Sequence, residues 1–213
     1  MTSLVLASAS PARLITLQRA GVRPEVVVSG VDEARVIADH EVARGPLDAA
    51  EIAETLAVAK ATDVALRLRP RQRLDQIVLG CDSVLELQGQ VYGKPGTAEV
   101  ARARWRQMRG QRGVLHTGHC LVDPADSAEP QTASATAATT VTFADLTDEE
   151  IDAYVATGEP LLVAGAFTVD GLGAPYVTSI EGDYHNVVGV SLPLLRVMLG
   201  DFGIAWHHLR QGH

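Results

Sequence analysis

The chain has 213 residues, of which 46% are hydrophobic and 21% charged, and its formal net charge is −8. This composition is typical of a globular protein, and an aromatic content of only 4% leaves the core to aliphatic side chains. The acidic balance argues against a nucleic-acid polymer or an anionic membrane as partner. Cys81 and Cys120 form no CxxC pair, and no apolar run is long enough for a membrane span, so we expect a reducing, cytoplasmic location.

Apolar runs bounded by turn residues predict strands at residues 5–7, 26–28 and 77–81. Capping residues followed by apolar positions at helical spacing predict helices that begin at Ser10, Asp48, Thr97, Asp148 and near Pro193. The run 77–81, IVLGC, is uninterrupted up to Asp82, which is typical of a central strand covered on both faces. It leads into an expected hairpin over residues 84–92, which turns at Gln88 and Gly89.

The segment from Ala128 to Thr142 consists mainly of Ala, Thr, Ser and Gln. Its composition fits a flexible linker, but its end, TTVTF, has strand character. We therefore expect an exposed loop that runs into a strand. The sequence shows no internal repeat and no domain boundary, so residues 1–213 are interpreted as one α/β domain in which about the last ten residues form a tail.

The turn LASASPAR, residues 6–13, combines a helix start with two hydroxyl groups and an arginine. A helix N-terminus carries unpaired N–H groups and the positive end of the helix dipole, and both favour phosphate. Ser8 and Ser10 add hydroxyl groups, and the guanidinium of Arg13 can hold two phosphate oxygens. The alternative is an ordinary capped helix with a solvated arginine, and this stretch alone leaves both interpretations open.

Charged residues elsewhere in the chain are further candidates. Asp82 follows an apolar strand, so it is expected at the strand's C-terminal end, where α/β folds collect ligands, and it can bind Mg²⁺ or act as a general base. The alternative is an aspartate that caps a turn. Glu33, beside Asp32, is a second carboxylate or part of a solvated loop. Lys60, on an alanine-rich helix, and Lys94, in a Gly-Lys-Pro turn, are phosphate contacts or surface lysines.

The motifs, taken in chain order, resemble one family. They are LASASPAR at 6–13, VDE at 31–33, LAVAKA at 56–61, CDSV at 81–84, GKP at 93–95, HTG at 116–118, EPLLVAGAF at 159–167 and IEGDYHNVVGVSLPLL at 180–195. In this order, over residues 4–203, they resemble the Maf-type nucleoside triphosphate pyrophosphatases, also described as septum-formation inhibitors, and in particular an actinobacterial branch. Each motif is weak alone, and the specificity lies in their order.

The resemblance implies a fold like that of inosine triphosphate pyrophosphatases, with a long mixed sheet, flanking helices and two lobes around a cleft. It implies hydrolysis of nucleoside triphosphates, including ones with modified bases, to the monophosphate and pyrophosphate by a homodimer with Mg²⁺ or Mn²⁺. It also implies a set of site residues. The catalytic residues are Asp82, Lys60, Lys94 and Arg13; the substrate-binding residues are Ser8, Ser10, Arg13, Lys60 and Lys94; and the metal ligands are Glu33 and Asp82.

The chain departs from the family pattern at two places that concern the base. Ala12 replaces the first arginine of the frequent SPRR form. The segment AGAFTVDG, residues 164–171, differs from the AGAYGIQG-like form of the branch that acts on dTTP and UTP, and resembles the branch that acts on 7-methyl-GTP. We therefore add Asp170 to the substrate-binding residues, as an acceptor for donors on the base. We also expect that dTTP is not the preferred substrate.

Two other functions are considered. The first is a nucleotide-binding regulator of septation or cell division whose hydrolysis is vestigial. A pure binding protein has no need of a base and metal ligands, so the complete set of charged residues favours the enzyme. The second is a phosphatase that forms an aspartyl phosphate, but the chain lacks a DxDxT-like nucleophile motif.

Overall fold

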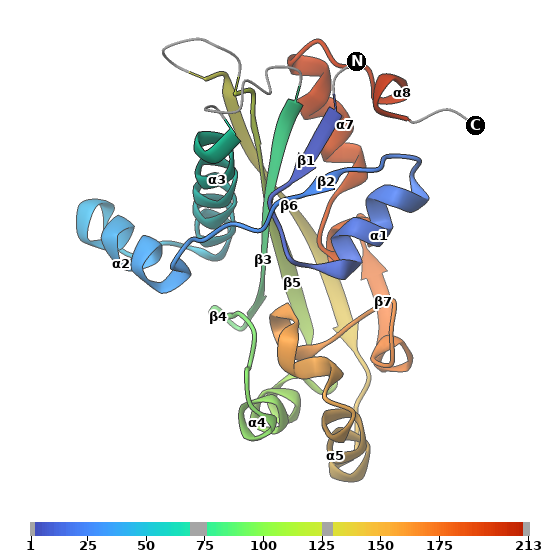
Figure 1. Cartoon of the computed structure of the whole chain (residues 1–213). Helices are drawn as coiled ribbons and strands as arrows, with labels where there is room; N and C mark the ends of the chain where they lie inside the picture. The colour runs from blue at the N-terminus through green and yellow to red at the C-terminus, as the bar shows by residue number, and fades with distance from the viewer. Residues whose placement is uncertain (1–2, 69–75, 125–129, 211–213) are drawn as a thin grey trace.

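The computed structural model describes residues 3–68, 76–124 and 130–210. Within these residues, seven strands form one mixed sheet in the order β2-β1-β3-β5-β6-β7, and β4 pairs with β3 (Figure 1). The pairs β1–β2 and β1–β3 are parallel and the remaining pairs are antiparallel. The strands are β1 (Ser3–Leu6), β2 (Glu25–Val26), β3 (Gln76–Leu87), β4 (Gln90–Tyr92), β5 (Arg112–Val122), β6 (Thr132–Phe143) and β7 (Val177–Glu181).

Helices cover both faces of this sheet. In Figure 1, α3 lies on one face, and α1 and α7 lie on the other. The α-helices are α1 (Pro11–Arg19), α2 (Glu33–Arg44), α3 (Ala49–Leu68), α4 (Ala98–Met108), α5 (Asp148–Ala156), α6 (Tyr184–Val188), α7 (Leu192–Asp201) and α8 (Trp206–Leu209); short 3₁₀ helices are η2 (Glu159–Leu162), η3 (Ala164–Ala166) and η4 (Ala174–Tyr176). The expected long mixed sheet with flanking helices is confirmed.

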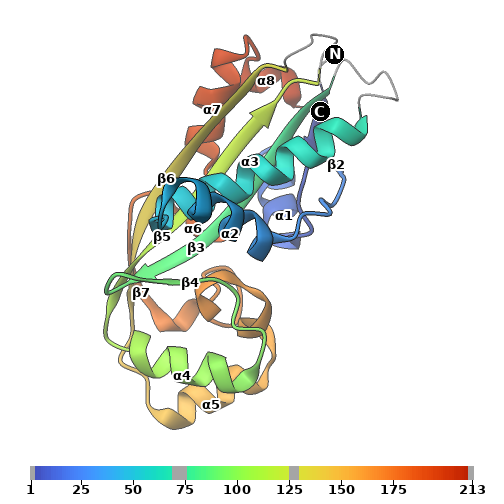
Figure 2. The same cartoon turned by 90° about the vertical axis from the view of Figure 1, so that its left-hand side faces the viewer.

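The hydrophobic core is divided between two lobes, and β3 and β5 run through both. Figure 2 shows α4 and α5 in a smaller lobe below the main body that carries α1, α3 and α7. The core of the smaller lobe is aromatic: Trp105 packs edge-on against Phe143 and Tyr154, with ring centroids 5.7 and 5.6 Å apart. In the main body the core is aliphatic, with Leu79 and Val78 of β3 packed on its two faces.

Helix α3 lies unusually close to the sheet because glycines face it. A Cβ atom built on Gly80 would lie 2.3 Å from the carbonyl oxygen of Ala57, and one on Gly118 would lie 2.2 Å from that of Ala53. These distances are too short for any side chain, so glycine is required at both strand positions. The close approach sets the height at which the side chains of α3 meet β3.

Strand β3 is longer than the sequence predicted. It continues through Asp82 to Leu87, so the expectation that Asp82 stands at the end of its strand is wrong. The expected hairpin is confirmed: Gln88 and Gly89 form its turn with φ of 51° and 76°, and Leu87 pairs with Gln90. Asp82 stays inside the strand because β5 pairs with β3 continuously from residue 78 to residue 86.

Two other expectations are corrected. The exposed loop expected before TTVTF is wrong for residues 132–138, because β6 pairs with β5 from residue 132 to residue 142. Ser134 and Thr136 of β6 also donate hydrogen bonds to Glu54 of α3. Residues 128 and 129 lie outside the described residues. The expected tail is wrong for residues 206–210, because α8 buries Leu209 and Arg210 forms a β-bridge with Val22. Residues 211–213 lie outside the described part.

Candidate active site

The predicted site residues meet at a gap in the sheet beside β3. Strand β1 pairs with β3 up to residue 79, and β4 pairs with it from residue 85 onward. Between these points, the described residues place no strand on this side of β3. The gap lies at the carboxyl end of the parallel strand β1, which is the end where α/β sheets bind ligands. The expectation that Asp82 lies at the carboxyl end of a strand is thus wrong for its own strand, β3, but Asp82 does lie beside the carboxyl end of β1.

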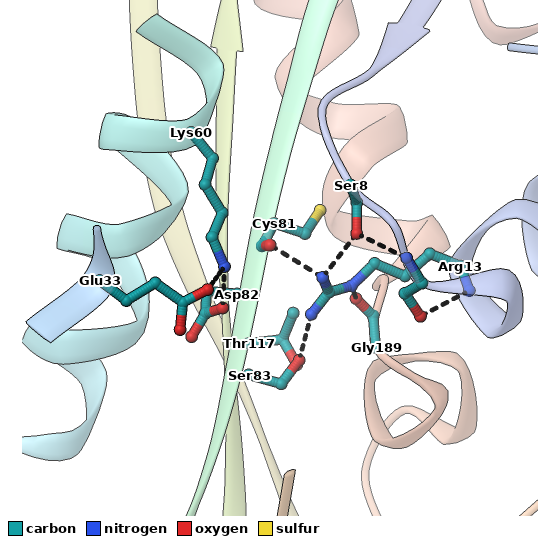
Figure 3. Close-up of polar contacts among 10 residues, drawn as sticks. Ser8, Arg13, Glu33, Lys60, Cys81, Asp82, Ser83, Thr117 and Gly189 are labelled. Atoms are coloured by element: carbon teal, nitrogen blue, oxygen red, sulfur yellow. Dashed lines mark hydrogen bonds and ion pairs between the residues drawn. The ribbon is translucent and has the colours of Figure 1, made fainter. Parts of the chain in front are cut away.

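Neighbouring residues of β3 point to opposite faces at this gap (Figure 3). Asp82 faces α3, where its carboxylate accepts a hydrogen bond from Lys60 Nζ at 2.5 Å. Ser83 faces α1, where its hydroxyl accepts a hydrogen bond from Arg13 Nη2 at 2.9 Å. Both residues are less buried than the apolar stretches before and after them, so they stand where the two cores are separated.

The first cluster consists of one lysine and two carboxylates. Lys60 Nζ lies 2.5 Å from Asp82 Oδ1 and 2.7 Å from Glu33 Oε1. The side chains of Lys60 and Asp82 are 10% and 13% exposed, whereas that of Glu33 is half exposed. Glu33 begins α2, a helix none of whose residues is buried, and Asp32 caps it. Lys60 is thus fixed from the protein interior, and Glu33 approaches it from the surface.

The balance of burial and nearby charge shifts the pKa values of the two carboxylates in opposite directions. Burial raises the pKa of Asp82 above its usual value, although the nearby charges of Lys60 and Arg13 act in the opposite direction. For Glu33, burial also raises the pKa, but the hydrogen bond and charge of Lys60, together with the charges of Lys94 and Arg13, lower it overall. Asp82 is therefore the stronger proton acceptor of the pair, and Glu33 holds its negative charge more firmly.

Lys94 belongs to the other side of the gap. It lies in the exposed loop between β4 and α4. Its charge contributes to the low pKa of Glu33, which places it within electrostatic range of the lysine and carboxylate cluster. The predicted set thus draws charges from the smaller lobe as well as from the main body.

The second cluster is centred on Arg13, whose side chain is buried. Arg13 Nε donates to the carbonyl of Gly189 at 2.7 Å, and Nη1 donates to Ser8 Oγ at 3.0 Å and to the carbonyl of Cys81 at 2.9 Å. With the bond to Ser83, four of its five N–H groups are committed. The carbonyl of Cys81 lies on the open edge of β3, so the guanidinium supplies the hydrogen bond that a neighbouring strand would have made.

These contacts revise the expected role of Arg13. The expectation that its fork holds two phosphate oxygens does not fit this structure, because only one N–H, on Nη2, has no partner among the described residues. Arg13 is positioned as a fixed cation with a single remaining donor. Its buried charge, rather than a bidentate contact, is what it brings to the gap.

The two serines of the turn act on the helix start. Ser10 caps α1 by accepting a hydrogen bond from the backbone N–H of Arg13 at 3.4 Å, and Pro11 opens the helix as expected. Ser8 Oγ accepts from the backbone N–H of Ser10 at 3.2 Å as well as from Arg13. The hydroxyl proton of Ser8 finds no acceptor among the described residues, so it remains available to a ligand.

Asp170 takes part in none of the hydrogen bonds or ion pairs that join the other predicted residues. It lines a cavity of about 180 Å³ together with Thr16, Tyr184 and His185. None of the seven other predicted site residues lines this cavity. A contact between Asp170 and the substrate therefore stays a prediction, and the geometry here gives it no direct support.

Sequence reasoning missed several residues that hold the site. Ser83 and Thr117 join their hydroxyl groups at 2.9 Å, and Thr117 donates to the carbonyl of Asn186 at 3.1 Å. Gly189 provides the carbonyl for Arg13 Nε. All four lie in motifs quoted above, CDSV, HTG and NVVG, but the motifs alone assign them no role. A signal was present for Ser83 and Thr117, because both are polar residues inside long and largely buried strands.

The family model described as Maf-like protein matches residues 3–202. The chain therefore belongs to the Maf-like family. The motif order in the sequence and the mixed sheet with its flanking helices agree with this membership.

Curated relatives cover nearly the whole chain. A protein of Salinispora tropica is 55% identical over 201 residues, covering 94% of this chain and 84% of its own length. One of Streptomyces avermitilis is 53% identical and covers 94% and 91%, and one of Rhodococcus erythropolis is 50% identical and covers 96% and 95%. Each of these three proteins is named nucleoside triphosphate pyrophosphatase.

Proposed function

We propose that the protein is an enzyme that hydrolyses nucleoside triphosphates between the α and β phosphates, releasing the monophosphate and pyrophosphate. The observation that carries the proposal is the pair of opposed clusters at the β3 gap: a buried carboxylate and lysine on one face, and a buried arginine with hydroxyl groups on the other. The relatives at about 50% identity support the enzyme class by their name.

The residue types suit this reaction. Water attacks the α phosphorus, the bond to the bridging oxygen breaks, and pyrophosphate leaves. Asp82 accepts the proton of the attacking water, a role that its raised pKa favours. Lys60, Lys94 and Arg13 stabilise the negative charge that gathers on the departing pyrophosphate. The hydroxyl of Ser8 donates a hydrogen bond to a phosphate oxygen.

The donor set also fits a divalent cation. Carboxylate oxygens of Glu33 and Asp82 converge on a single cationic atom, Lys60 Nζ. Mg²⁺ is commonly bound by one or two carboxylates together with substrate phosphates and water. The described ranges contain no group of three or more His, Cys, Asp or Glu that could hold a metal ion, so a cation at Glu33 and Asp82 would take its other ligands from the phosphates and water. When bound, Mg²⁺ or Mn²⁺ neutralises phosphate charge and polarises the phosphorus–oxygen bonds.

The setting of the enzyme is also part of the proposal. None of the helices in the described part of the chain has the length and apolar character needed to cross a membrane. A homodimer rests on the resemblance stated above, and a cytoplasmic location rests on the cysteine usage and the lack of a long apolar run in the sequence. Multi-angle light scattering after size-exclusion chromatography tests the dimer.

Product analysis tests the reaction. The purified protein is incubated with Mg²⁺ or Mn²⁺ and a panel of canonical and modified nucleoside triphosphates, and the nucleotides and phosphates are separated. We expect the monophosphate and pyrophosphate, loss of turnover with excess EDTA, and loss of turnover in Asp82→Asn. The matched control is Asp152→Asn, which removes an exposed carboxylate paired with Arg102.

Other outcomes separate the alternatives. Release of the diphosphate and orthophosphate contradicts the proposed bond cleavage. Tight nucleotide binding without any turnover favours the regulator of septation. A panel in which dTTP leads by about tenfold, a difference of 1.4 kcal/mol in transition-state stabilisation, contradicts the expectation drawn from Asp170.

A further inference from the structure

A line of two hydroxyl groups, those of Ser83 and Thr117, connects Arg13 to the segment between β7 and α7. Arg13 Nη2 lies 2.9 Å from Ser83 Oγ, which lies 2.9 Å from Thr117 Oγ1 (Figure 3). Thr117 Oγ1 in turn lies 3.1 Å from the carbonyl oxygen of Asn186. Thr117 and Asn186 are fully buried. Three segments that are distant in sequence, on α1, on the β3–β5 pair and on α6, are thereby joined through two side-chain hydroxyl groups.

The two ends of the line fix the direction of every bond in it. A guanidinium can only donate, so Ser83 Oγ accepts from Arg13. A carbonyl can only accept, so the hydroxyl of Thr117 donates its single hydrogen bond to the carbonyl oxygen of Asn186. The contact between the two hydroxyl groups must then run from Ser83 to Thr117. Every donor in the line has one acceptor, and bonds aligned in this way strengthen one another in a low-dielectric interior.

The segment that receives the line is itself held firmly. The side-chain nitrogen of Asn186, Nδ2, lies within hydrogen-bond distance of the carbonyls of Leu115 and Ala137 and of Thr139 Oγ1. His119 accepts a hydrogen bond from the backbone N–H of Ser191 at 2.8 Å. The same segment gives the carbonyl of Gly189 to Arg13 Nε. The carbonyls of Asn186 and Gly189 thus reach Arg13 by two routes, one through the hydroxyl line and one directly.

We infer that Thr117 and Ser83 are positioning residues for Arg13. Their hydroxyl groups orient the guanidinium so that its one uncommitted N–H, on Nη2, has a fixed direction at the β3 gap. This inference rests on the proposed function, because the value of a fixed donor is to meet the phosphate oxygen on which charge gathers. Neither hydroxyl group touches the substrate; both act through Arg13.

Thr117→Val is the direct test, because valine keeps the shape of threonine and removes the hydroxyl. Ser83 then loses its acceptor, and its hydroxyl is free to turn. We expect kcat to fall roughly tenfold, the effect of one misdirected hydrogen bond, while KM changes less. Thr117→Ser restores the hydroxyl and should restore kcat. Thr178→Val is the matched control, because the Thr178 hydroxyl also donates to a backbone carbonyl but lies exposed on β7.

A spectroscopic readout separates this inference from the proposed function. In ¹⁵N-labelled protein, the Nη hydrogens of Arg13 should give separate, slowly exchanging signals, assigned through their loss in Arg13→Lys. These signals should merge or broaden in Thr117→Val and return in Thr117→Ser. If Thr117→Val does not fold, Ser83→Ala is measured instead, because it removes the same link from the other side.

Two results overturn the inference. One is an Arg13 signal that is unchanged in Thr117→Val and Ser83→Ala, since the hydroxyl line then does not orient the guanidinium. The other is a lost signal with unchanged kcat, since the orientation then has no catalytic effect. If the wild-type protein releases no pyrophosphate from any triphosphate, the proposed function fails. In that case the Arg13 signals alone decide whether the hydroxyl line orients the arginine.

Discussion

Replacing Gly80 by alanine tests whether the close packing of α3 on the sheet holds the active site together. The new Cβ would lie 2.3 Å from the carbonyl oxygen of Ala57 and 2.9 Å from the Cβ of Ala61. One of these neighbours is a backbone oxygen and the other is a Cβ atom, so neither can move away by a side-chain rotation. To reach an ordinary contact of 3.4 Å, α3 must recede by about 1 Å.

This displacement acts directly on Lys60, which lies between the two alanines on the same helix. Its Nζ lies 2.5 Å from Asp82, and a retreat of about 1 Å takes the pair beyond the usual hydrogen-bond length of about 3.2 Å. We expect kcat/KM to fall on the order of a hundredfold, as misplacement by about 1 Å commonly costs. The free energy of unfolding should fall by about 1–3 kcal/mol through overpacking.

Urea unfolding and steady-state kinetics of Gly80→Ala measure the two effects separately. Gly200→Ala is the matched control, because a Cβ on Gly200 of α7 would meet nothing within 4 Å and its φ is not positive. That variant should keep its activity and gain up to about 1 kcal/mol, since alanine suits a helix better than glycine. A Gly80→Ala protein with kcat/KM within about threefold of wild type would refute the reasoning, because the site would then tolerate a shift of α3.

Two further predictions concern buried polar groups on the α1 face of the sheet. Arg13→Lys leaves at most three donors for four acceptors, so urea unfolding should show a loss of about 1–3 kcal/mol, and kcat/KM should fall at least about tenfold; a neutral effect would contradict the four-bond geometry. His119 is neutral, because Nδ1 faces the carbonyl of Thr117 and Nε2 accepts from Ser191, and burial lowers its pKa from 6.5 to about 4. The unfolded chain binds a proton at His119 more readily than the folded chain does. The contribution of neutral His119 to the free energy of unfolding is therefore complete above pH 6.5 and is lost as the pH falls to about 4. The difference of about 2.5 between the two pKa values corresponds to about 3 kcal/mol. Between pH 6.5 and about 4, the free energy of unfolding of the wild type should fall by about this amount more than that of His119→Gln. Parallel curves of unfolding free energy against pH for the two proteins would contradict the prediction.

The sequence was informative where the signal is local. Ser10 caps α1, and Asp48, the expected helix start, forms a reciprocal capping box with Glu51. These features depend on residues three positions apart, so they can be recognised without knowledge of the fold. The turn at Gln88 and Gly89 is equally local. The family resemblance added the residue types of the site, which local signals alone left open.

Non-local pairing explains what the sequence did not reveal. Residues 132–138 are all small, either Ala, Ser or Thr, and they form a strand because β5 is available to pair with them along their whole length. The partners of Arg13 at Cys81 and Gly189 lie 68 and 176 positions away in the chain. No spacing rule connects such positions, so an arginine that is bound on four sides looks the same in the sequence as one that is free to hold phosphate.

The gap in the sheet explains how groups on opposite faces of one strand can serve a single ligand. Asp82 and Ser83 are neighbours, so their side chains must point to opposite faces, and a continuous sheet would keep the two sides apart. Strand β1 pairs with β3 only up to residue 79, and β4 pairs with β3 only over residues 85–87. In the described residues, this edge of β3 is therefore open between residues 79 and 85. A triphosphate lying across that edge can reach Lys60 on one side and Arg13 on the other. The early end of β1 is therefore as much a part of the proposed site as the charged residues, and the turn from Ser8 to Arg13 follows directly from it.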